Sequence, residues 1–238
     1  MSKNLKITLG SIYLAILIIF LYFLFSKFDF TRINDFSYYK TIQSNMDEFV
    51  GSNLIYNLII FFLFSFTWVV LLGFGSPILL LSGILFGKWI GTIVSTASIS
   101  IGALCLYILA NFFFSDLTHY LLKDKFSKYI KRFQQNEFYY FFAFRFAGGL
   151  GLPFFLQNVL PVIFNMKKKN YFFASILGLL PHFYIWNTIG AGINNFIKES
   201  ESFNFASLLM SKEIYIPVII FLILITASLI IKKKYFDE

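Results

Sequence analysis

Residues 138–170 read FYYFFAFRFAGGLGLPFFLQNVLPVIFNMKKKN. This stretch contains a single arginine, Arg145, inside a run of aromatic and aliphatic residues, and a cluster of helix breakers follows: Gly148, Gly149, Gly151 and Pro153. An apolar run that enters a bilayer normally excludes both, because a charged side chain at a helix centre costs about 2.5 to 3.5 kcal/mol and proline and glycine interrupt a helix. We therefore expect a hairpin of short helices here rather than one straight spanning helix.

The composition indicates a membrane protein. Of the 238 residues, 58% are hydrophobic and 13% are charged, whereas a soluble domain averages about 25% charged residues. Because so few charges cannot cover a water-exposed surface, lipid is the expected solvent. The formal net charge of +8 could point to nucleic acid, but the basic residues stand in short clusters between apolar runs. That pattern is typical of membrane topology, so we expect no nucleic-acid partner.

Four apolar runs reach the roughly 20 residues needed to span the hydrocarbon core. They cover residues 7–26, 89–114, 170–192 and 214–231. The first run lacks the small-residue cleavage site of a secretory signal peptide, so we expect it to be kept as a spanning helix.

Two further apolar regions are interrupted. Residues 54–87 contain GFGSP at positions 73–77, and residues 138–166 contain GGLGLP at positions 148–153. Some of the halves on either side of these breaks are too short to span, which favours helical hairpins that enter the membrane and return to the same side.

The distribution of basic residues supports this topology. With a cytoplasmic N-terminus and both broken regions re-entrant, 13 of the 20 Lys and Arg residues fall on the cytoplasmic side and six outside, as the positive-inside rule requires. The cytoplasmic segments are 1–6, 115–137, 167–169 and 232–234. We therefore expect a multi-pass protein of the cell membrane, inner or plasma, with both termini in the cytoplasm.

The order of segments repeats along the chain. A polar, partly amphipathic stretch at 31–50 precedes the first broken region and the helix at 89–114. A basic amphipathic stretch at 115–135, which is expected to lie in the interface, precedes the second broken region and the helix at 170–192. The hairpins enter from opposite sides, so the two halves are related by inverted topology, a plan common among transporters.

The predicted fold is an all-α polytopic membrane protein with four spanning helices, two opposed re-entrant hairpins in an inverted repeat, and interfacial amphipathic helices. Residues 1–53 form the first spanning helix and an extracytoplasmic interfacial segment. Residues 54–195 form the core with both hairpins, and residues 196–238 form the last spanning helix and a basic tail.

Two signatures resemble the VTT-domain superfamily, which includes the DedA proteins and the SNARE-associated Golgi proteins. The first is GSPILLLSGILFGKWIGTIVSTASISIGALCLYILA at 75–110. The second joins FRFAGGLGLPFFLQNVLPVIFN at 144–165 to YFFASILGLLPHFYIWNTIGAGI at 171–193. The resemblance covers roughly residues 54–195, and the matching positions are Gly83, Gly87, Arg145, Pro153, Asn158, Gly178, Pro181 and Gly190.

The sequence also departs from that pattern. Pro161 stands where the family usually has a small residue. Residues 54–87 contain no Asp or Glu, although the DedA branch carries acidic residues near its first hairpin that are implicated in proton-coupled transport. The chain is therefore similar to the less acidic branch of the superfamily.

Arg145 is the leading candidate for a binding residue. Its guanidinium could bind a lipid phosphate or another anion in a wet cavity between the hairpins. Alternatively, it could reach the cytoplasmic interface or hold carbonyl groups of the turn. Gln157 and Asn158 either clamp the hairpins together or contact the ligand. His182 either shuttles protons or is a hydrogen-bonded structural histidine.

Other residues are assigned to helix breaking and close packing, because glycine permits positive φ and small residues at i and i+4 let helices touch. They are Gly73, Gly75, Pro77, Gly83, Gly87, Gly148, Gly149, Gly151, Pro153, Pro161, Gly178, Pro181 and Gly190. No metal site is expected from two widely separated histidines and one cysteine. No cofactor is expected either. Without a recognisable nucleophile–base pair, the sequence does not predict an enzyme.

The resemblance, together with Arg145 and the inverted hairpins, implies movement of lipid across the bilayer. Scrambling or flipping of a phospholipid or of a polyprenyl-phosphate carrier would both fit. The alternatives are an ion- or proton-coupled small-solute transporter that uses the same cavity, and a non-transporting membrane scaffold that recruits partners through residues 115–135. Membrane lipids are the expected partners, and formation of a homo-oligomer is left open.

Overall fold

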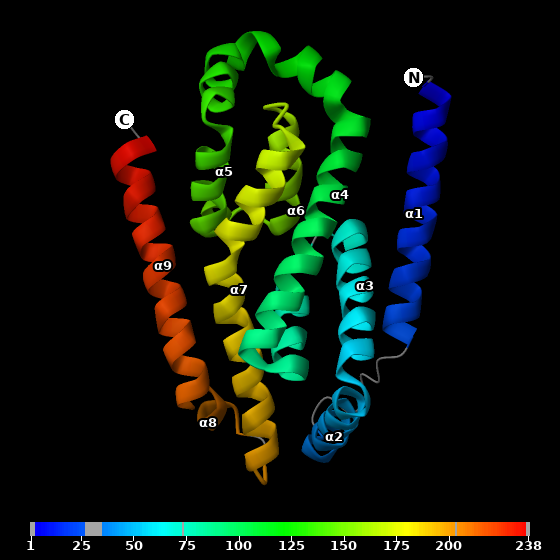
Figure 1. Cartoon of the computed structure of the whole chain (residues 1–238), viewed down its shortest axis with the longest axis vertical. Coiled ribbons are helices and arrows are strands. Elements are labelled where there is room, and N and C mark those ends of the chain that lie inside the picture. Colours follow the sequence, from blue (N-terminus) through cyan, green and yellow to red (C-terminus); the bar gives the residue numbers. More distant parts are fainter. Residues whose placement is uncertain (1–2, 27–34, 73, 203, 237–238) are drawn as a thin grey trace.

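The computed structural model describes residues 3–26, 35–72, 74–202 and 204–236. Within these ranges every regular element is a helix (Figure 1). The elements are α1 (Lys3–Ser26), α2 (Phe36–Ser52), α3 (Leu54–Leu72), α4 (Ser76–Gln135), α5 (Glu137–Phe146), η2 (Gly148–Gly151), α6 (Phe154–Val159), η3 (Leu160–Val162), α7 (Lys168–Glu199), α8 (Phe205–Leu209) and α9 (Lys212–Phe236). Gly73, residues 31–34 and the side chains of residues 115–129 lie outside this description.

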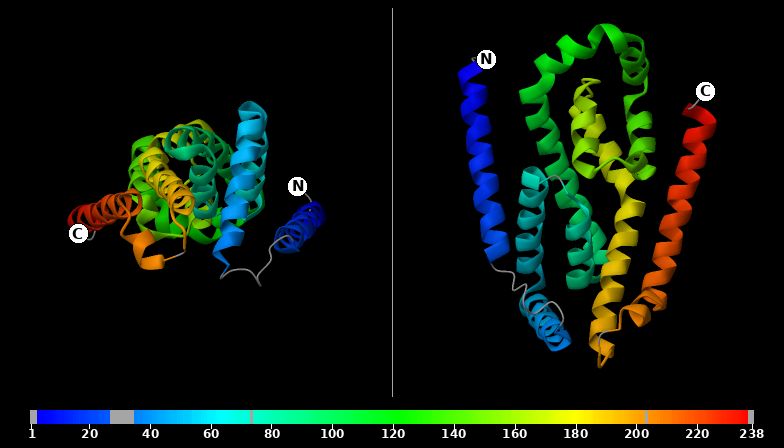
Figure 2. Two further views of the ribbon diagram at one scale, coloured as in Figure 1. Left: turned by 90° about the horizontal axis from the view of Figure 1, so that it is seen from below. Right: turned by 180° about the vertical axis from the view of Figure 1, so that it is seen from behind.

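α3 and the beginning of α4 form the first helix–turn–helix segment. α3 starts at the end of the molecule where α2 lies, and the chain turns near half-height before α4 runs back (Figures 1 and 2). Pro77 occupies the first turn of α4, where the N–H that proline lacks would have no helical partner.

α4 then reverses direction at Gly87. This residue has φ 71° and ψ −180°, a conformation that side chains other than glycine rarely adopt. A Cβ at Gly87 would meet nothing within 4 Å, whereas a Cβ at Gly83 would overlap the backbone of Asn187. Gly83 therefore makes the close helix contact that the G-x-x-x-G spacing predicts. Gly87 does not, because it serves the reversal.

From Lys88 onward α4 runs toward the end of the molecule opposite α2 and arches over that end to Gln135 (Figure 1). The predicted spanning helix at 89–114 and the predicted interfacial helix at 115–135 are thus parts of one element rather than two. Residues 88–135 contain no proline. No residue there lacks the backbone N–H of a helical hydrogen bond, so nothing ends the helix between the two predicted segments.

α5, η2 and α6 form the second helix–turn–helix segment, which starts from the opposite end (Figure 1). Its turn contains four consecutive residues with positive φ: Gly148 at 68°, Gly149 at 69°, Leu150 at 54° and Gly151 at 81°. Three of the four are glycine, which adopts such values without the steric cost of a Cβ.

The turns of the two segments meet near the middle of the molecule. A Cβ at Gly75, in the first turn, would lie 3.8 Å from the ring of Phe154, which begins α6. The two breaks in the sequence are therefore brought together in space.

α7 is the central helix and packs against α4, α5 and α9. A Cβ at Gly190 would overlap the carbonyl oxygen of Leu80, so this glycine lets α7 approach α4 closely. Pro181 lies inside α7, and the helix continues through it.

On the outside of the bundle, α1 flanks α3 and α9 flanks α7 (Figure 2). The hydroxyl of Tyr13 joins α1 to α3 by donating to the carbonyls of Leu71 (2.8 Å) and Val70 (3.1 Å).

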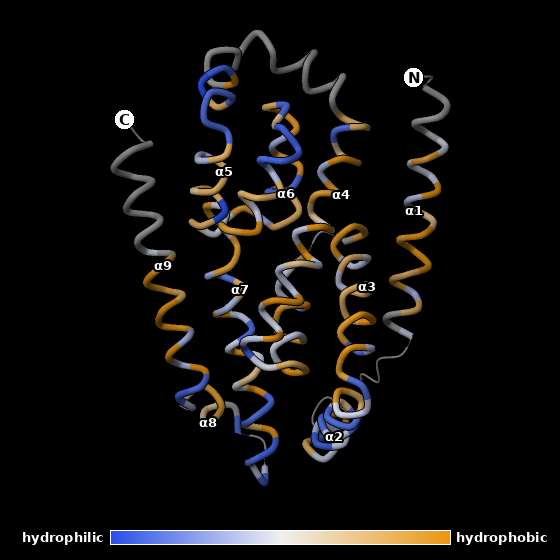
Figure 3. The backbone as a smooth tube through the Cα atoms, viewed as in Figure 1, coloured by the Kyte–Doolittle hydropathy of each residue, from blue (hydrophilic) through white to orange (hydrophobic). Residues whose placement is uncertain are grey.

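Among the residues that the structure describes, three helical stretches are long and apolar enough to cross a membrane: Leu54–Leu71, Ser76–Phe114 and Lys168–Glu199. The described apolar part of α1, Thr8–Phe23, is shorter. Hydrophilic residues gather at the two ends of the molecule, while hydrophobic residues predominate between them on α1 and α3 (Figure 3).

Two of the four predicted spans, 89–114 and 170–192, lie within these stretches, whereas the described apolar part of the predicted span 7–26 falls short of that length. α3, which the sequence assigns to a hairpin, has itself the length to span. The predicted span at 214–231 lies in α9, whose side chains are described only in part.

Candidate functional site

Arg145 lies in the last turn of α5, and its side chain is completely buried, with 0% exposed. It donates hydrogen bonds to groups from two other helices. Nη1 donates to Gln157 Oε1 over 3.1 Å, and Nη2 donates to Asn158 Oδ1 and, over 3.0 Å, to the hydroxyl of Tyr171. Arg145 therefore joins both legs of the second helix–turn–helix segment to the start of α7.

Three aromatic rings surround the guanidinium. The distance from Arg145 Cζ to the ring centroid is 4.8 Å for Phe141, 5.3 Å for Phe154 and 5.6 Å for Tyr171. A cation within about 6 Å of an aromatic ring is attracted by the ring quadrupole, more strongly when water is excluded. The rings therefore offset part of the cost of burying the charge.

No carboxylate offsets the rest of that cost among the residues that the structure describes. The hydrogen-bond partners of Arg145 are two amides and a phenol, all neutral. In addition, the buried Nε of Arg145 and the buried Nδ2 of Asn158 have no partner. A buried charge is normally paired and its donors are normally satisfied, so this cluster has an excess of positive charge and of donors.

Gln157 has a second role in the turn. Its Nε2 donates to the carbonyls of Leu152 (2.7 Å) and Gly148 (3.4 Å), while its Oε1 accepts from Arg145. A Cβ at Gly149 would overlap the side chain of Gln157. The glycines of the turn are thus needed both for backbone conformation and for the space that this amide fills.

Tyr171 completes the cluster and is the residue that sequence reasoning missed. Its hydroxyl lies 3.0 Å from Asn158 Oδ1 and 3.2 Å from the carbonyl oxygen of Ala103. Its ring stacks on Tyr107 with centroids 4.6 Å apart. The only signal in the sequence was a tyrosine at the start of the helix that follows the arginine, which by itself does not predict contact.

Gly178 allows the close packing that brings Arg145 to Tyr171. A Cβ at this position would lie 2.6 Å from Arg145 Cβ and 3.0 Å from the carbonyl oxygen of Phe142. α5 and α7 can therefore approach this closely only because residue 178 has no side chain.

His182 is not part of the cluster. It lies 11 residues beyond Tyr171 on α7, a separation of about 16 Å along a helix. Its Nε2 accepts a hydrogen bond of 3.0 Å from Trp186 Nε1, and its ring centroid is 5.1 Å from that of Phe221 on α9. The structure thus brings Arg145, Gln157 and Asn158 together and separates His182 from them.

A second buried polar group joins α4 to α7. Asn187 Nδ2 donates to Ser95 Oγ over 3.2 Å and to the carbonyl of Phe183 over 2.8 Å, and Asn187 Oδ1 has no partner. This group carries no charge and gives α4 and α7 a fixed register.

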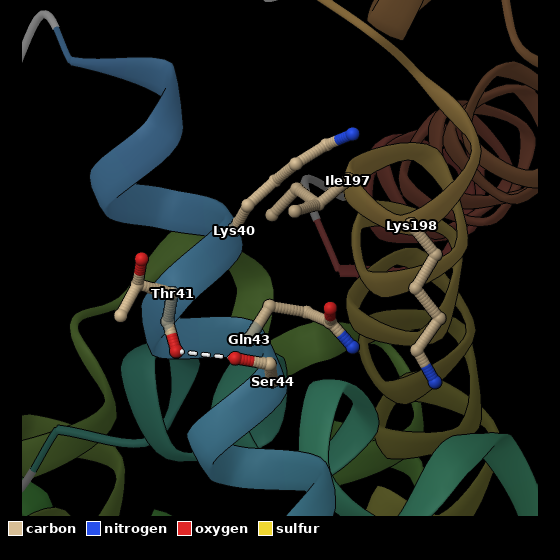
Figure 4. Close-up of a pocket in the computed structure, with 6 residues that line it drawn as sticks. All are labelled: Lys40, Thr41, Gln43, Ser44, Ile197 and Lys198. Carbon is tan, nitrogen blue, oxygen red and sulfur yellow. Dashed lines mark hydrogen bonds between the residues drawn. The ribbon is translucent and has the colours of Figure 1, made fainter.

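A hollow on the surface lies between α2 and the end of α7 (Figure 4). It is lined by Lys40, Thr41, Gln43, Ser44, Ile197 and Lys198. Lys198 Nζ lies 2.8 Å from Asp47 Oδ2, so one of the two cations already has a counter-charge. The hollow is about 40 Å along α7 from Tyr171 and is separate from the Arg145 cluster.

Within the described ranges, no group of three or more His, Cys, Asp or Glu side chains could hold a metal ion.

No solved structure matches the chain. The family model of the VTT domain matches residues 74–192. This region begins at the turn before α4 and ends within α7. The matched region includes both turns, the Arg145 cluster and the Asn187 contact. The chain therefore belongs to the VTT-domain family of membrane proteins.

Proposed function

We propose that this protein moves lipids across the bilayer by scrambling or flipping a phospholipid or a polyprenyl-phosphate carrier, with Arg145 binding the headgroup phosphate. One observation carries the proposal. Arg145 is fully buried, its partners are neutral, and Arg145 and its partner Asn158 each have a buried donor without a partner. A phosphate would supply the missing negative charge and the missing acceptors, and arginine binds phosphate with two parallel N–H donors.

Two further features support the proposal. The two helix–turn–helix segments start from opposite ends and meet at Gly75 and Phe154, which is the arrangement expected of two re-entrant hairpins in an inverted repeat. In transporters built on that plan, the substrate site lies where the broken helices meet. The proposal includes this membrane topology, with both termini in the cytoplasm and the protein in the cell membrane.

In the proposed mechanism, the headgroup enters between the second helix–turn–helix segment and α7 while its acyl chains stay in lipid. The phosphate replaces Gln157 and Asn158 as partner of the guanidinium, and the released amides bind other headgroup atoms. Because Arg145 is 0% exposed, this exchange requires the segment to move away from α7.

The experiment is a lipid-movement assay on proteoliposomes with labelled phospholipid. We expect the wild-type protein to equilibrate the label between leaflets, and Arg145→Ala to lose most of this activity. Arg132→Ala is the matched control, since Arg132 is an exposed arginine of α4 and its loss should leave the rate unchanged. Wild-type protein that moves no lipid, or Arg145→Ala protein that moves it equally well, would refute the proposal.

The same preparation separates the alternatives. A small-solute transporter would give substrate-dependent current or pH change in liposomes without lipid movement. A scaffold would lose its biological function on charge reversal within residues 115–135 but not with Arg145→Ala.

A further inference from the structure

Side-chain hydrogen bonds hold the second helix–turn–helix segment at its end farthest from Arg145. Gln134 Nε2 donates to the carbonyl of Phe164 over 3.0 Å, and the hydroxyl of Tyr107 donates to the carbonyl of Met166 over 2.6 Å. The carboxylate of Glu137 accepts from the backbone N–H of Lys167 over 3.2 and 3.3 Å and from Asn170 Nδ2 over 2.6 Å. We call these bonds the outer latch.

Glu137 is the charged member of the outer latch. Only 5% of it is exposed, and it forms no ion pair with a basic side chain among the described residues. Its carboxylate lies at the N-terminus of the 32-residue helix α7, whose N-cap residue, Lys167, provides no side-chain cap of its own. A negative charge is favourable at that position because the first N–H groups of a helix are unsatisfied and its dipole is positive there.

The backbone on both sides of the latch is suited to a hinge. Asn136 is the single residue between α4 and α5, and it has the non-helical angles φ −138° and ψ 39°. On the other side, Asn165 has a positive φ of 46°. Hinges are a few residues at element ends that absorb changes in φ and ψ. α5 begins with Glu137, so the latch holds the first residue beyond the hinge.

The geometry points to Glu137 as a positioning residue that keeps α5 closed against α7 and thereby controls access to Arg145. This inference rests on the proposed function, because access matters only if Arg145 meets a ligand. The carboxylate joins the first residue of α5 to the first turn of α7, and Arg145 lies on the same helix eight residues further on. When the carboxylate is released, α5 can swing about Asn136 and open the cluster.

The first test joins α5 to α7 by a covalent bridge at the outer latch. Glu137→Cys and Asn170→Cys are combined with Cys105→Ser, which removes the single native thiol, and the two cysteines are bridged with a short bifunctional methanethiosulfonate. We expect bridging to slow lipid movement at least about tenfold and a reductant to restore it, while each single-cysteine variant is unaffected by the reagent. Equal rates before and after bridging would overturn the latch but leave the proposed function standing.

The second test does not depend on lipid movement. Ser175 is buried with 0% exposed and lies one helical turn beyond Tyr171. The rate at which a small maleimide labels Ser175→Cys, in the Cys105→Ser background, therefore reports opening of the cluster. We expect Glu137→Ala to raise this rate about tenfold, as expected when a buried charged hydrogen-bond acceptor is removed. Glu137→Gln, which keeps an acceptor oxygen, should give a smaller increase.

Two controls make the labelling result decisive. Glu48→Ala removes an exposed carboxylate of α2 and should leave the rate unchanged. Ser65→Cys places a buried thiol on α3, away from the latch, and Glu137→Ala should not accelerate its labelling. Labelling that rises at both thiols indicates general unfolding, and labelling that rises at neither shows that Glu137 holds nothing closed; either result refutes the inference. If wild-type protein moves no lipid, the proposed function fails, but the labelling test still shows whether Glu137 keeps α5 closed against α7.

Discussion

The hydroxyl of Tyr171 accepts a hydrogen bond from Arg145 Nη2 over 3.0 Å, and this contact joins α5 to α7 at the centre of the molecule. The two residues are 26 positions apart in the chain, yet both are completely buried.

Removing that hydroxyl tests how far Tyr171 stabilises the buried charge. Tyr171→Phe keeps the stacked ring but leaves Arg145 with one acceptor fewer, which should lower the free energy of unfolding by about 1.5 to 3 kcal/mol, the usual worth of a hydrogen bond to a charged group. Thermal unfolding in detergent measures the change. Tyr184→Phe is the control, because Tyr184 lies on the same helix and its hydroxyl forms no hydrogen bond with the residues that the structure describes. An equal loss in both variants would contradict the assignment.

Substitutions in the turn separate backbone strain from the space that Gln157 needs. Gly148, Gly149 and Gly151 all have positive φ, but only at Gly149 would a Cβ overlap another residue, Gln157. Each alanine variant should lose about 1 kcal/mol for the left-handed backbone, and Gly149→Ala should lose clearly more and reduce lipid movement as well. Unfolding midpoints and transport rates check this. Three equal losses would show that Gln157 accommodates the extra methyl group.

Gly178 should be intolerant of any side chain. In Gly178→Ala the new methyl group would lie 2.6 Å from Arg145 Cβ, so α5 must move away from α7, and overpacking of this kind costs about 1 to 3 kcal/mol. Gly51→Ala in α2 is the matched control, since a Cβ there meets nothing within 4 Å and alanine favours a helix. We expect opposite signs for the two changes in thermal stability. A neutral Gly178→Ala variant would show that the interface is looser than this distance implies.

His182→Gln distinguishes a structural histidine from a proton shuttle. Glutamine can still accept the hydrogen bond that Trp186 donates to His182, so folding and lipid movement should stay close to wild type. A variant that folds normally, as judged by size-exclusion chromatography, but moves no lipid would instead favour a role for His182 in transport.

Much of the second helix–turn–helix segment follows from local chemistry. The cluster of glycine and proline at positions 148–153 strongly disfavours a continuous helix, and polar side chains so close to a buried arginine become its nearest partners. Arg145, Gln157 and Asn158 are within 14 residues of one another, so a single turn brings them together. Tyr171 could not be predicted in this way, because its contact depends on how closely α5 packs against α7, which Gly178 decides.

Gly87 illustrates a different limit. Its spacing from Gly83 matches a helix-packing pattern, but the same spacing also fits a glycine needed for a reversal at φ 71°. Spacing carries no information on backbone angles, so only the structure distinguishes the two roles. The joining of residues 89–114 and 115–135 into one helix is simpler to explain. No proline interrupts them, and the change from apolar to basic composition alters the surroundings of a helix without ending it.

The close approach of Gly75 to Phe154 has a consequence for the proposed passage of a charged headgroup along this protein. The C-terminal ends of α3 and α5 and the N-terminal ends of α4 and α6 meet near half-height. Their backbone dipoles and their N–H and C=O groups without a partner inside the helix bring polar groups together there. In the proposed membrane topology, this point lies near the middle of a hydrocarbon slab of about 30 Å. Since the electrostatic barrier to an ion is highest at the centre of an unbroken slab, polar groups at that depth lower the barrier where it would otherwise peak.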